Sequence, residues 1–147
     1  MLYLASDHAG YQLKKYLKRY LTTQLKIKVV DLGPSRYDPE DDYPLIAQKL
    51  AKRVAGKREH RGILICGTGH GVCLVANKVR GVRAGVGYNI EAAERGRKED
   101  NLNVLCLAGR FLTPEHAAAI VKKFLATEFE RTARYLRRLK EVEAIDA

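Results

Sequence analysis

A chain of 147 residues is long enough to fold as one domain and to bury roughly 68–70% of its unfolded surface in a single core. No stretch approaches the roughly 18 apolar residues of a membrane span. The N-terminal segment MLYLASDHAG reaches Asp7 and His8 before a signal-peptide pattern can develop. We therefore expect one cytoplasmic domain, residues 1–147, without a membrane partner.

The formal net charge of +10 favours an anionic partner such as phosphate, nucleic acid or an acidic surface. Much of the excess lies in two segments with helical patterns, residues 11–20 and 131–144, where a solvated basic face is the alternative. Tryptophan is absent and the eight tyrosines are scattered, so no base-stacking platform for nucleic acid is evident. The three cysteines, Cys66, Cys73 and Cys106, match neither a zinc site nor a disulfide framework, and we expect reduced thiols.

Strand and helix patterns alternate along the chain. The first strand is expected at residues 2–6, followed by a helix in which Leu13, Leu17 and Leu21 recur on one face. Later strands are expected at 27–33, 62–66, 82–87 and 103–109, and later helices at about 43–55, 70–78, 89–100, 114–126 and 129–145. This alternation predicts an α/β fold with a parallel sheet covered by helices on both faces.

Ligands of an open parallel sheet collect at the carboxyl ends of its strands, near the point where strand order reverses. This rule places four segments along one edge: SDHAG (6–10), CGTGHG (66–71), the polar end of the helix at 89–100, and the loop after the fifth strand. In SDHAG, Asp7 and His8 stand between a strand and a helix, where Asp7 has a helix cap as its alternative role. We expect the chemistry at this edge.

The segment CGTGHG combines a thiol, a hydroxyl, an imidazole and three glycines in six residues. Its spacing matches neither a P-loop nor a dinucleotide-binding loop. It is typical of backbone N–H groups that point at a phosphate or a developing oxyanion. Thiols at helix N-termini often have a pKa lowered from about 8.5 toward about 7. Cys66 is thus a candidate nucleophile or base and Thr68 a candidate proton relay, whereas a buried cysteine before a glycine-rich turn is the structural alternative.

The chain contains, in this order, SDHAG, DYP (42–44), GILICGTGHG, ANKVRGVRAGV, NVLCLAGR and a C-terminal helix with spaced arginines. Together these segments resemble the family of ribose-5-phosphate isomerase B and galactose-6-phosphate isomerase, over nearly the whole chain. The resemblance implies a Rossmann-like three-layer α/β/α sandwich with a five-stranded parallel sheet. It also implies a homodimer or homotetramer without metal or cofactor, with active sites at the subunit interface and the helix at about 129–145 packing there.

The activity implied by this resemblance is the interconversion of ribose 5-phosphate and ribulose 5-phosphate through a cis-enediolate, an intramolecular oxidoreductase reaction of the pentose phosphate pathway. Such a reaction needs a base beside the carbon atoms and donors for the oxyanion, each donor worth about 3 kcal/mol. By resemblance, Cys66 is the base, Thr68 handles the substrate oxygens and Asp7 holds a sugar hydroxyl. The substrate-binding residues at the same edge are then His8, Tyr43, Gly67, Gly69, His70 and Gly71.

The phosphate group is expected to bind arginines. Arg134 and Arg138 are four residues apart, share a helical face and match the family's arginine pair. The local sequence reads TARY with one extra residue upstream, so Arg131 and Arg137 are possible substitutes. Arg110, after the fifth strand, matches a further arginine at the family's site.

One position departs from the resemblance. Relatives that act on ribose 5-phosphate carry a histidine, assigned to opening the furanose ring, where this chain has Glu99, followed by Asp100 in place of asparagine. A carboxyl group has a reference pKa near 4.3 against about 6.5 for imidazole, and is the poorer proton donor near pH 7 unless burial raises its pKa. Three alternatives stay open: Glu99 opens the ring, another group such as His70 does so, or the substrate is a different sugar phosphate such as allose 6-phosphate or galactose 6-phosphate.

Two further hypotheses come from other classes of protein. The basic charge motivates a nucleic-acid-binding module, which would bind with a steep dependence on salt. The carboxylates at 99 and 100 motivate a phosphate-binding sensor that has lost catalysis.

Overall fold

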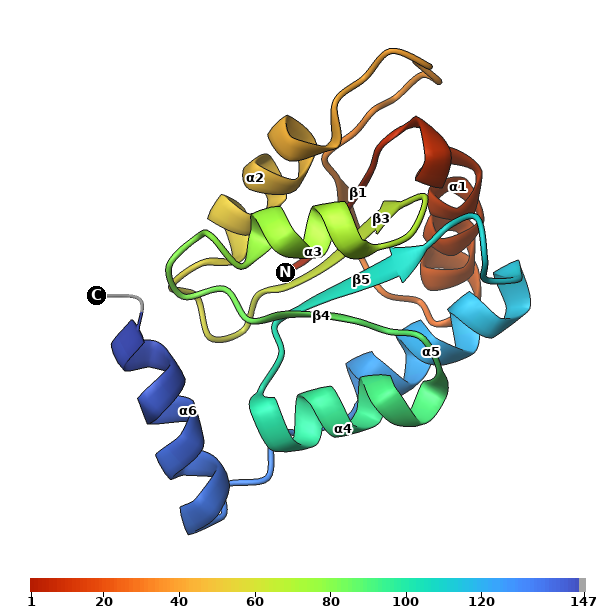
Figure 1. Ribbon diagram of the computed structural model, residues 1–147. Helices are drawn as coiled ribbons and strands as arrows, with labels where there is room; N and C mark the ends of the chain where they lie inside the picture. The colour runs from red at the N-terminus through yellow and green to blue at the C-terminus, as the bar shows by residue number, and fades with distance from the viewer. Residues whose placement is uncertain (146–147) are drawn as a thin grey trace.

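The computed structural model describes residues 1–145, which form a five-stranded sheet with helices on both faces (Figure 1). All neighbouring strands are parallel, and their order is β2-β1-β3-β5-β4. The strands span Leu2–Ser6 (β1), Val29–Asp31 (β2), Arg61–Cys66 (β3), Ala84–Val86 (β4) and Val104–Ala108 (β5). The expected three-layer α/β sandwich is confirmed. The last two residues of the expected domain, 146 and 147, lie outside the described residues.

Helices cover the two faces of the sheet. One face packs against α1 (Tyr11–Arg19), which continues into a π-helical turn at Tyr20–Gln24, and against α4 (Ile90–Asp100) and α5 (Pro114–Ala126). The other face packs against α2 (Tyr43–Val54) and α3 (His70–Ala76). The last helix, α6 (Ala133–Ile145), lies beside α4 at one end of the molecule. Within residues 1–145, no helix is both long and apolar enough to cross a bilayer.

The central strands bury both of their faces. Leu4, Ile63 and Leu105 point into the core beneath α1 and α5, while Leu64 and Cys106 point into the core beneath α2 and α3. All five are fully buried. A side chain such as leucine stabilises the fold by about 1.5–3 kcal/mol when it is buried in this way. Burial on both faces explains why these strands read as continuous apolar runs rather than as alternating patterns.

Some element boundaries differ from those expected. Both edge strands, β2 and β4, are shorter than predicted, because each pairs with only one neighbour. The helix expected from residue 129 begins only at Ala133. Before it, the backbone N–H of Glu130 donates to the carbonyl of Lys98 at 2.9 Å, and Thr132 Oγ1 then accepts from the N–H of Tyr135 at 3.2 Å. This hydroxyl caps the start of α6.

The strand order reverses between β1 and β3. From β1 the chain passes to the outer strand β2 and then returns across β1 to β3. The register pairs Ser6 with Ile65 and Cys66 with Ala108, so the carboxyl ends of β1, β3 and β5 lie side by side. A reversal of this kind opens a crevice for ligands at the carboxyl ends of the strands.

Candidate functional site

Three loops meet at the carboxyl ends of β1, β3 and β5, and we call residues 6–10, 66–71 and 109–110 the carboxyl edge. Backbone hydrogen bonds tie these loops together. The N–H of Asp7 donates to the carbonyl of Ile65 at 3.1 Å, and the N–H of Gly109 donates to the carbonyl of Cys66 at 2.8 Å. The predicted meeting of the SDHAG segment, the CGTGHG segment and the loop after the fifth strand is therefore confirmed.

The chain forms a tight turn around the Cys66 thiol. Cys66 ends β3 and is only 5% exposed. Its Sγ accepts a hydrogen bond from the backbone N–H of Gly69 at 3.1 Å, which holds the sulfur inside the turn. Gly69 has a φ of +79°, in the left-handed region that favours glycine. Thr68 Oγ1 accepts from the N–H of His70 at 3.2 Å, so the hydroxyl stays beside the turn.

The other two cysteines lie outside this turn. Cys73 belongs to α3, and its Sγ lies 3.5 Å from the carbonyl oxygen of Ala84. A hydrogen bond with Cys106 lowers the pKa of Cys73, and burial raises the pKa of Cys106. All three cysteines are free thiols, as the sequence predicted. Cys66 is the thiol that belongs to the carboxyl edge.

Two groups that can carry positive charge flank the turn. The guanidinium of Arg110 covers Gly67 so closely that a Cβ on Gly67 would lie 2.9 Å from Nη1 of Arg110. His8 lies near enough to Arg110 that the guanidinium acts against protonation of the imidazole. Both residues were predicted substrate-binding residues, and their charges lie close enough to act on each other.

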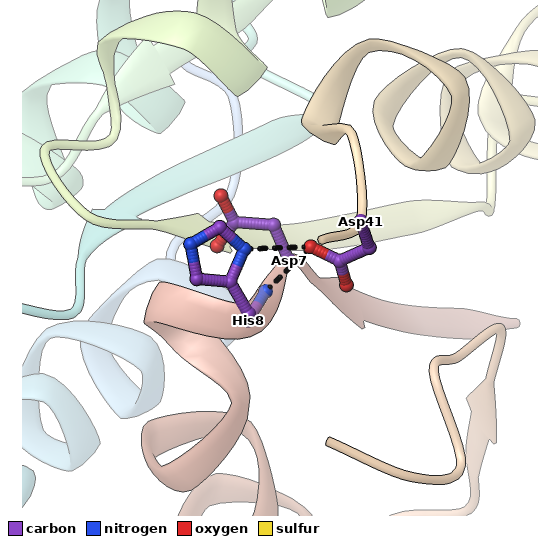
Figure 2. Close-up of side chains that lie close together, drawn as sticks. All are labelled: Asp7, His8 and Asp41. Carbon is purple, nitrogen blue, oxygen red and sulfur yellow. Dashed lines mark hydrogen bonds and ion pairs between the residues drawn. The ribbon is translucent and has the colours of Figure 1, made fainter. Parts of the chain in front are cut away.

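Figure 2 shows how His8 is held. Its backbone N–H donates to Asp41 Oδ1 at 2.9 Å, and its Nδ1 lies 2.8 Å from the same oxygen. This hydrogen bond is the main reason that the pKa of His8 is raised; burial acts in the opposite direction, and Asp7 adds to the increase. Asp41 was not among the predicted site residues, because 33 residues separate it from His8 and no local spacing links them.

Asp7 serves the fold with one of its oxygens. Its Oδ1 accepts from the N–H of Gly10 at 3.1 Å, so the helix-cap role is confirmed. Asp7, His8 and Asp41 also form a group whose potential metal-binding atoms all lie within 4.8 Å of one another. The shortest contact in this group is the hydrogen bond between His8 and Asp41. We therefore interpret the group as a hydrogen-bonded pair beside a helix cap.

Tyr43 and His70 reach the edge differently. The ring of Tyr43 packs on Gly71, where an added Cβ would lie 2.6 Å from Cε1 of the ring. Glycine at 71 is needed for this close approach. His70 is exposed and is the first residue of α3.

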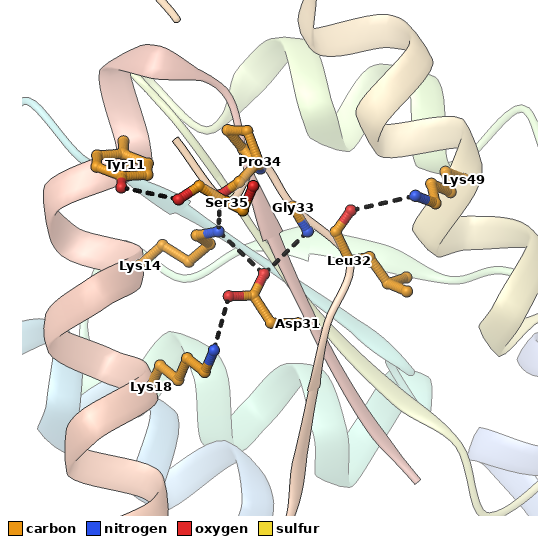
Figure 3. A network of polar contacts seen from close by, with 9 residues as sticks. All are labelled: Tyr11, Lys14, Lys18, Asp31, Leu32, Gly33, Pro34, Ser35 and Lys49. Atoms are coloured by element: carbon orange, nitrogen blue, oxygen red, sulfur yellow. Dashed lines mark hydrogen bonds and ion pairs between the residues drawn. The ribbon is translucent and has the colours of Figure 1, made fainter. Parts of the chain in front are cut away.

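A polar network anchors the loop that carries Asp41 (Figure 3). Asp31 Oδ1 accepts from Lys14 Nζ at 2.9 Å and from the N–H of Gly33 at 2.9 Å. Lys14 Nζ also donates to the carbonyl of Pro34 at 2.5 Å. Only 2% of the lysine is exposed, so these contacts take the place of water around its ammonium group. Burial alone would raise the pKa of Asp31, but the hydrogen bonds from Lys14 and Gly33 outweigh burial and lower it. The start of the loop is thereby fixed to α1.

The remaining predicted site residues lie away from the carboxyl edge of their own chain. Glu99 and Asp100 form the last turn of α4, which runs from the end of β4 back to the start of β5. The expectation that this polar end joins the carboxyl edge was wrong. A helix that connects two parallel strands runs antiparallel to them, so its last turn lies at the amino ends of the strands.

Asp100 lies beside α6 rather than beside Cys66. It lines a cavity of about 380 Å³ with Arg138 and residues of β4 and α6. Burial and the neighbouring Glu99 raise the pKa of Asp100, and Arg138 opposes this increase. Glu99 pairs with Arg95 at 2.9 Å on the surface of α4. The other predicted arginines, Arg131, Arg134 and Arg137, are all exposed in or before α6.

A basic cavity of about 460 Å³ also lies at the amino ends of the strands. Its lining includes Arg61, Arg83 and Arg97, but no residue of the carboxyl edge. Arg97 is 2% exposed and donates to the carbonyl of Leu102 at 2.5 Å. Burial and the nearby Arg61 lower the pKa of Arg97 to about 10. Part of the large positive charge is therefore collected at the end of the sheet opposite the Cys66 turn.

The chain is similar to known proteins over nearly its whole length. A family described as Ribose/Galactose Isomerase matches residues 2–142. A probable ribose-5-phosphate isomerase B of Mycoplasma pneumoniae is 46% identical over 129 residues, which cover 88% of this chain and 84% of the relative. A D-erythrulose-4-phosphate isomerase of Pectobacterium atrosepticum is 39% identical over 130 residues, which cover 86% of this chain and 83% of the relative.

A solved structure is also similar over nearly its full length. The crystal structure of ribose-5-phosphate isomerase B from Mycoplasma genitalium with bound ribulose-5-phosphate has a TM-score of 0.87 and 44% sequence identity. The match covers 99% of this chain and 95% of that one. The expected relationship and the expected class of enzyme are thus confirmed together: the chain belongs to the ribose/galactose isomerase family and is an isomerase.

Proposed function

We propose that this enzyme interconverts ribose 5-phosphate and ribulose 5-phosphate. The observation that carries the proposal is the Cys66 thiol, held in a glycine-rich turn at the reversal of strand order with Arg110 and His8 beside it. A base next to two cationic groups suits a substrate with a reacting carbon at one end and a phosphate at the other. The names of the relatives from Mycoplasma pneumoniae and Mycoplasma genitalium support this choice of substrate.

In the proposed reaction, the Cys66 thiolate removes the proton from C2 of the open-chain aldose and leaves an enediolate. Return of the proton to C1 gives the ketose. C2 is thereby oxidised and C1 reduced within the same sugar, so no external oxidant or reductant is needed. Thr68 moves the proton between the two substrate oxygens, and the N–H groups of Gly67 and Gly71 stabilise the negative charge on them, each worth about 3 kcal/mol when aligned. The second oxygen of Asp7 holds a sugar hydroxyl.

The proposed phosphate site needs a second copy of the chain. Arg110 and His8 supply the cations from one chain, and Arg134 and Arg138 of a second copy supply the rest. Two features support this arrangement: α6 lies away from the carboxyl end of β3 (Figure 1), which is the strand that Cys66 ends, and no residue of Ala133–Ile145 is buried. Sedimentation showing a strict monomer that turns over substrate would overturn this part of the proposal.

A four-carbon sugar phosphate is the second candidate substrate. The relative from Pectobacterium atrosepticum is named a D-erythrulose-4-phosphate isomerase. A tetrose with its phosphate on O4 has no free hydroxyl with which to close a five-membered ring, so its isomerisation requires no ring-opening acid. The carboxylates of Glu99 and Asp100, which replace the expected histidine and asparagine, favour such a substrate over allose 6-phosphate and galactose 6-phosphate, which form rings.

The test is proton exchange at C2 and ketose formation, followed by NMR in D₂O with the purified protein. The aldose substrates are ribose 5-phosphate, allose 6-phosphate and galactose 6-phosphate. D-Erythrulose 4-phosphate is already the ketose, so it is followed by proton exchange at C1 and by formation of the aldose. Turnover of ribose 5-phosphate with the highest kcat/KM supports the proposal, and a higher kcat/KM for another sugar reassigns the substrate. Exchange with none of the four overturns the proposal and favours a phosphate-binding protein. The cytoplasmic location stays a prediction, which fractionation of cells would test.

A further inference from the structure

One carboxylate oxygen makes both contacts that hold His8. Asp41 Oδ1 accepts from the backbone N–H of His8 at 2.9 Å and lies 2.8 Å from Nδ1. An ionised carboxylate only accepts hydrogen bonds, so Nδ1 carries the proton in this contact. The second ring nitrogen, Nε2, then points away from Asp41 (Figure 2). Asp41 thereby selects both the tautomer and the orientation of the imidazole.

The charges around His8 oppose each other. Asp41 and Asp7 favour the protonated imidazole, whereas burial and the guanidinium of Arg110 favour the neutral form. The hydrogen bond to Asp41 is the largest of these effects, and with it the pKa of His8 is raised. Without Asp41, the imidazole would face a fixed guanidinium with only Asp7 to offset the repulsion. Asp41 is therefore what allows two cationic groups to stand together at the carboxyl edge.

The placement of Asp41 involves several parts of the chain. Lys14, Asp31 and Tyr11 hold the beginning of the loop at Gly33–Ser35 (Figure 3). His8 holds its end, directly before α2 begins. The second oxygen of Asp41, Oδ2, is buried and has no hydrogen-bond partner among residues 1–145. A buried carboxylate oxygen without a donor costs free energy. Within the described chain, the hydrogen bonds of the Asp41 carboxylate all serve His8, and none ties it to the rest of its own loop.

We propose that Asp41 is a positioning residue for phosphate recognition: it holds His8 as a charged donor whose Nε2–H, together with Arg110, binds the phosphate of the substrate. This inference rests on the proposed function, which supplies the phosphate. The phosphate affinity then follows the protonation of His8. It is high while the imidazole is charged and falls as the pH rises through the pKa of His8.

Two variants separate charge from geometry. Asp41→Asn keeps an oxygen that can accept both hydrogen bonds from His8 and removes the charge, whereas Asp41→Ala removes both. Asp42→Asn is the matched control, because it removes the same charge at the next residue. The side chain of Asp42 is exposed and makes no capping hydrogen bond to α2. NMR titration of the imidazole resonances, assigned with a His8→Gln variant, reports the inflection and the tautomer of His8. Steady-state kinetics between pH 5.5 and 8.5 report KM and kcat.

For Asp41→Asn we expect the same tautomer but an inflection about one pH unit lower, which at pH 7.5 raises KM about fivefold to tenfold and leaves kcat within about twofold. At pH 5.5, where both enzymes carry a charged His8, the two KM values converge. Asp41→Ala also loses the tautomer preference and keeps a raised KM at pH 5.5. A merely structural role would change kcat and KM at every pH without moving the inflection.

The inference is overturned if Asp41→Asn matches Asp42→Asn in the inflection of His8 and in KM at pH 7.5. Failure of the proposed function is a separate outcome, because it shows as a wild-type protein that turns over no sugar phosphate. In that event inorganic phosphate serves as the probe. Two results together support the inference: phosphate raises the titration inflection of His8 in the wild type, and Asp41→Asn binds phosphate about tenfold more weakly. Equal phosphate affinities of the two proteins overturn it.

Discussion

The carboxyl edge and the last helix carry the predicted site residues, yet the two regions are built in opposite ways. At the edge, backbone hydrogen bonds join neighbouring loops, and Asp7 and Cys66 are 6% and 5% exposed. In α6 no residue of Ala133–Ile145 is buried, and Leu136, Val142 and Ile145 expose apolar surface. One chain is sufficient to shape the edge, whereas the arginines of α6 have no role in their own chain's site. This difference is why we propose that a second copy of the chain completes the phosphate site.

The largest effect is expected at the edge. Cys66→Ala should lower kcat by about 10³-fold, within the range for loss of a general base, while the fold stays intact. The measurement is C2 proton exchange by NMR, with circular dichroism as the check on folding. Cys73→Ala is the matched control and should keep most of the activity, because its sulfur contacts the carbonyl of Ala84 instead. Retained exchange in Cys66→Ala would remove this thiol as the base.

The arginines of α6 should show a large effect of another kind. Arg134→Gln and Arg138→Gln should each raise KM for the sugar phosphate about tenfold to a hundredfold, since each removes a charge-assisted hydrogen bond to phosphate. Lys140→Gln, on the same helix, is the control.

Mixing two variants tests directly whether the carboxyl edge of one chain and α6 of another form one site. At a substrate concentration well below the KM of Arg138→Gln, subunits of Cys66→Ala and Arg138→Gln refolded together should show more activity than the sum of the two variants alone, because one of the two shared sites in a mixed dimer contains both wild-type residues. Absence of recovery, with mixed dimers present by mass spectrometry, would place the helix and the thiol in separate functions.

A smaller effect is expected at the anchor of the loop that carries Asp41. The pKa of Asp31 is lowered in the fold, so its charged form stabilises the protein above the unfolded pKa near 3.8, and this stability is lost as the pH falls through the folded value. Asp31→Asn should reduce the free energy of unfolding by about 1–2 kcal/mol at pH 7. Urea unfolding should show the difference from wild type unchanged down to about pH 4 and shrinking below it. A difference that grows in acid would contradict the assigned hydrogen bonds.

The smallest effect concerns the turn itself. Gly69→Ala places a Cβ at a φ of +79° and 3.2 Å from the backbone of Leu107. Gly56→Ala has a similar φ of +71° but nothing within 4 Å, so it measures the cost of the backbone conformation alone. Both should lower the free energy of unfolding by about 1 kcal/mol, with up to about 1 kcal/mol more for Gly69→Ala. Equal losses in the two variants would mean that the turn adjusts to the extra carbon.

Much of the fold was predictable from local patterns. The run LYLAS corresponds to β1, Leu2–Ser6, and the alternation of apolar runs with helical periods indicated the parallel sheet. The CGTGHG segment predicted a glycine-rich loop at the end of a buried strand with Cys66 in it, and Cys66 is the last residue of β3. These features depend on neighbouring residues along the chain, whose conformational preferences the sequence states directly.

Tertiary structure decided the rest. The order of the strands brought the loops after β1, β3 and β5 together, and the return path of α4 took Glu99 and Asp100 to the opposite end of the sheet. The contact between His8 and Asp41 joins residues 33 positions apart, and its hydrogen bonds form only after the loop from Gly33 is anchored. Side-chain periodicity determines which face of an element is buried. Which loops share an edge depends on strand order and crossover direction, which distant contacts determine.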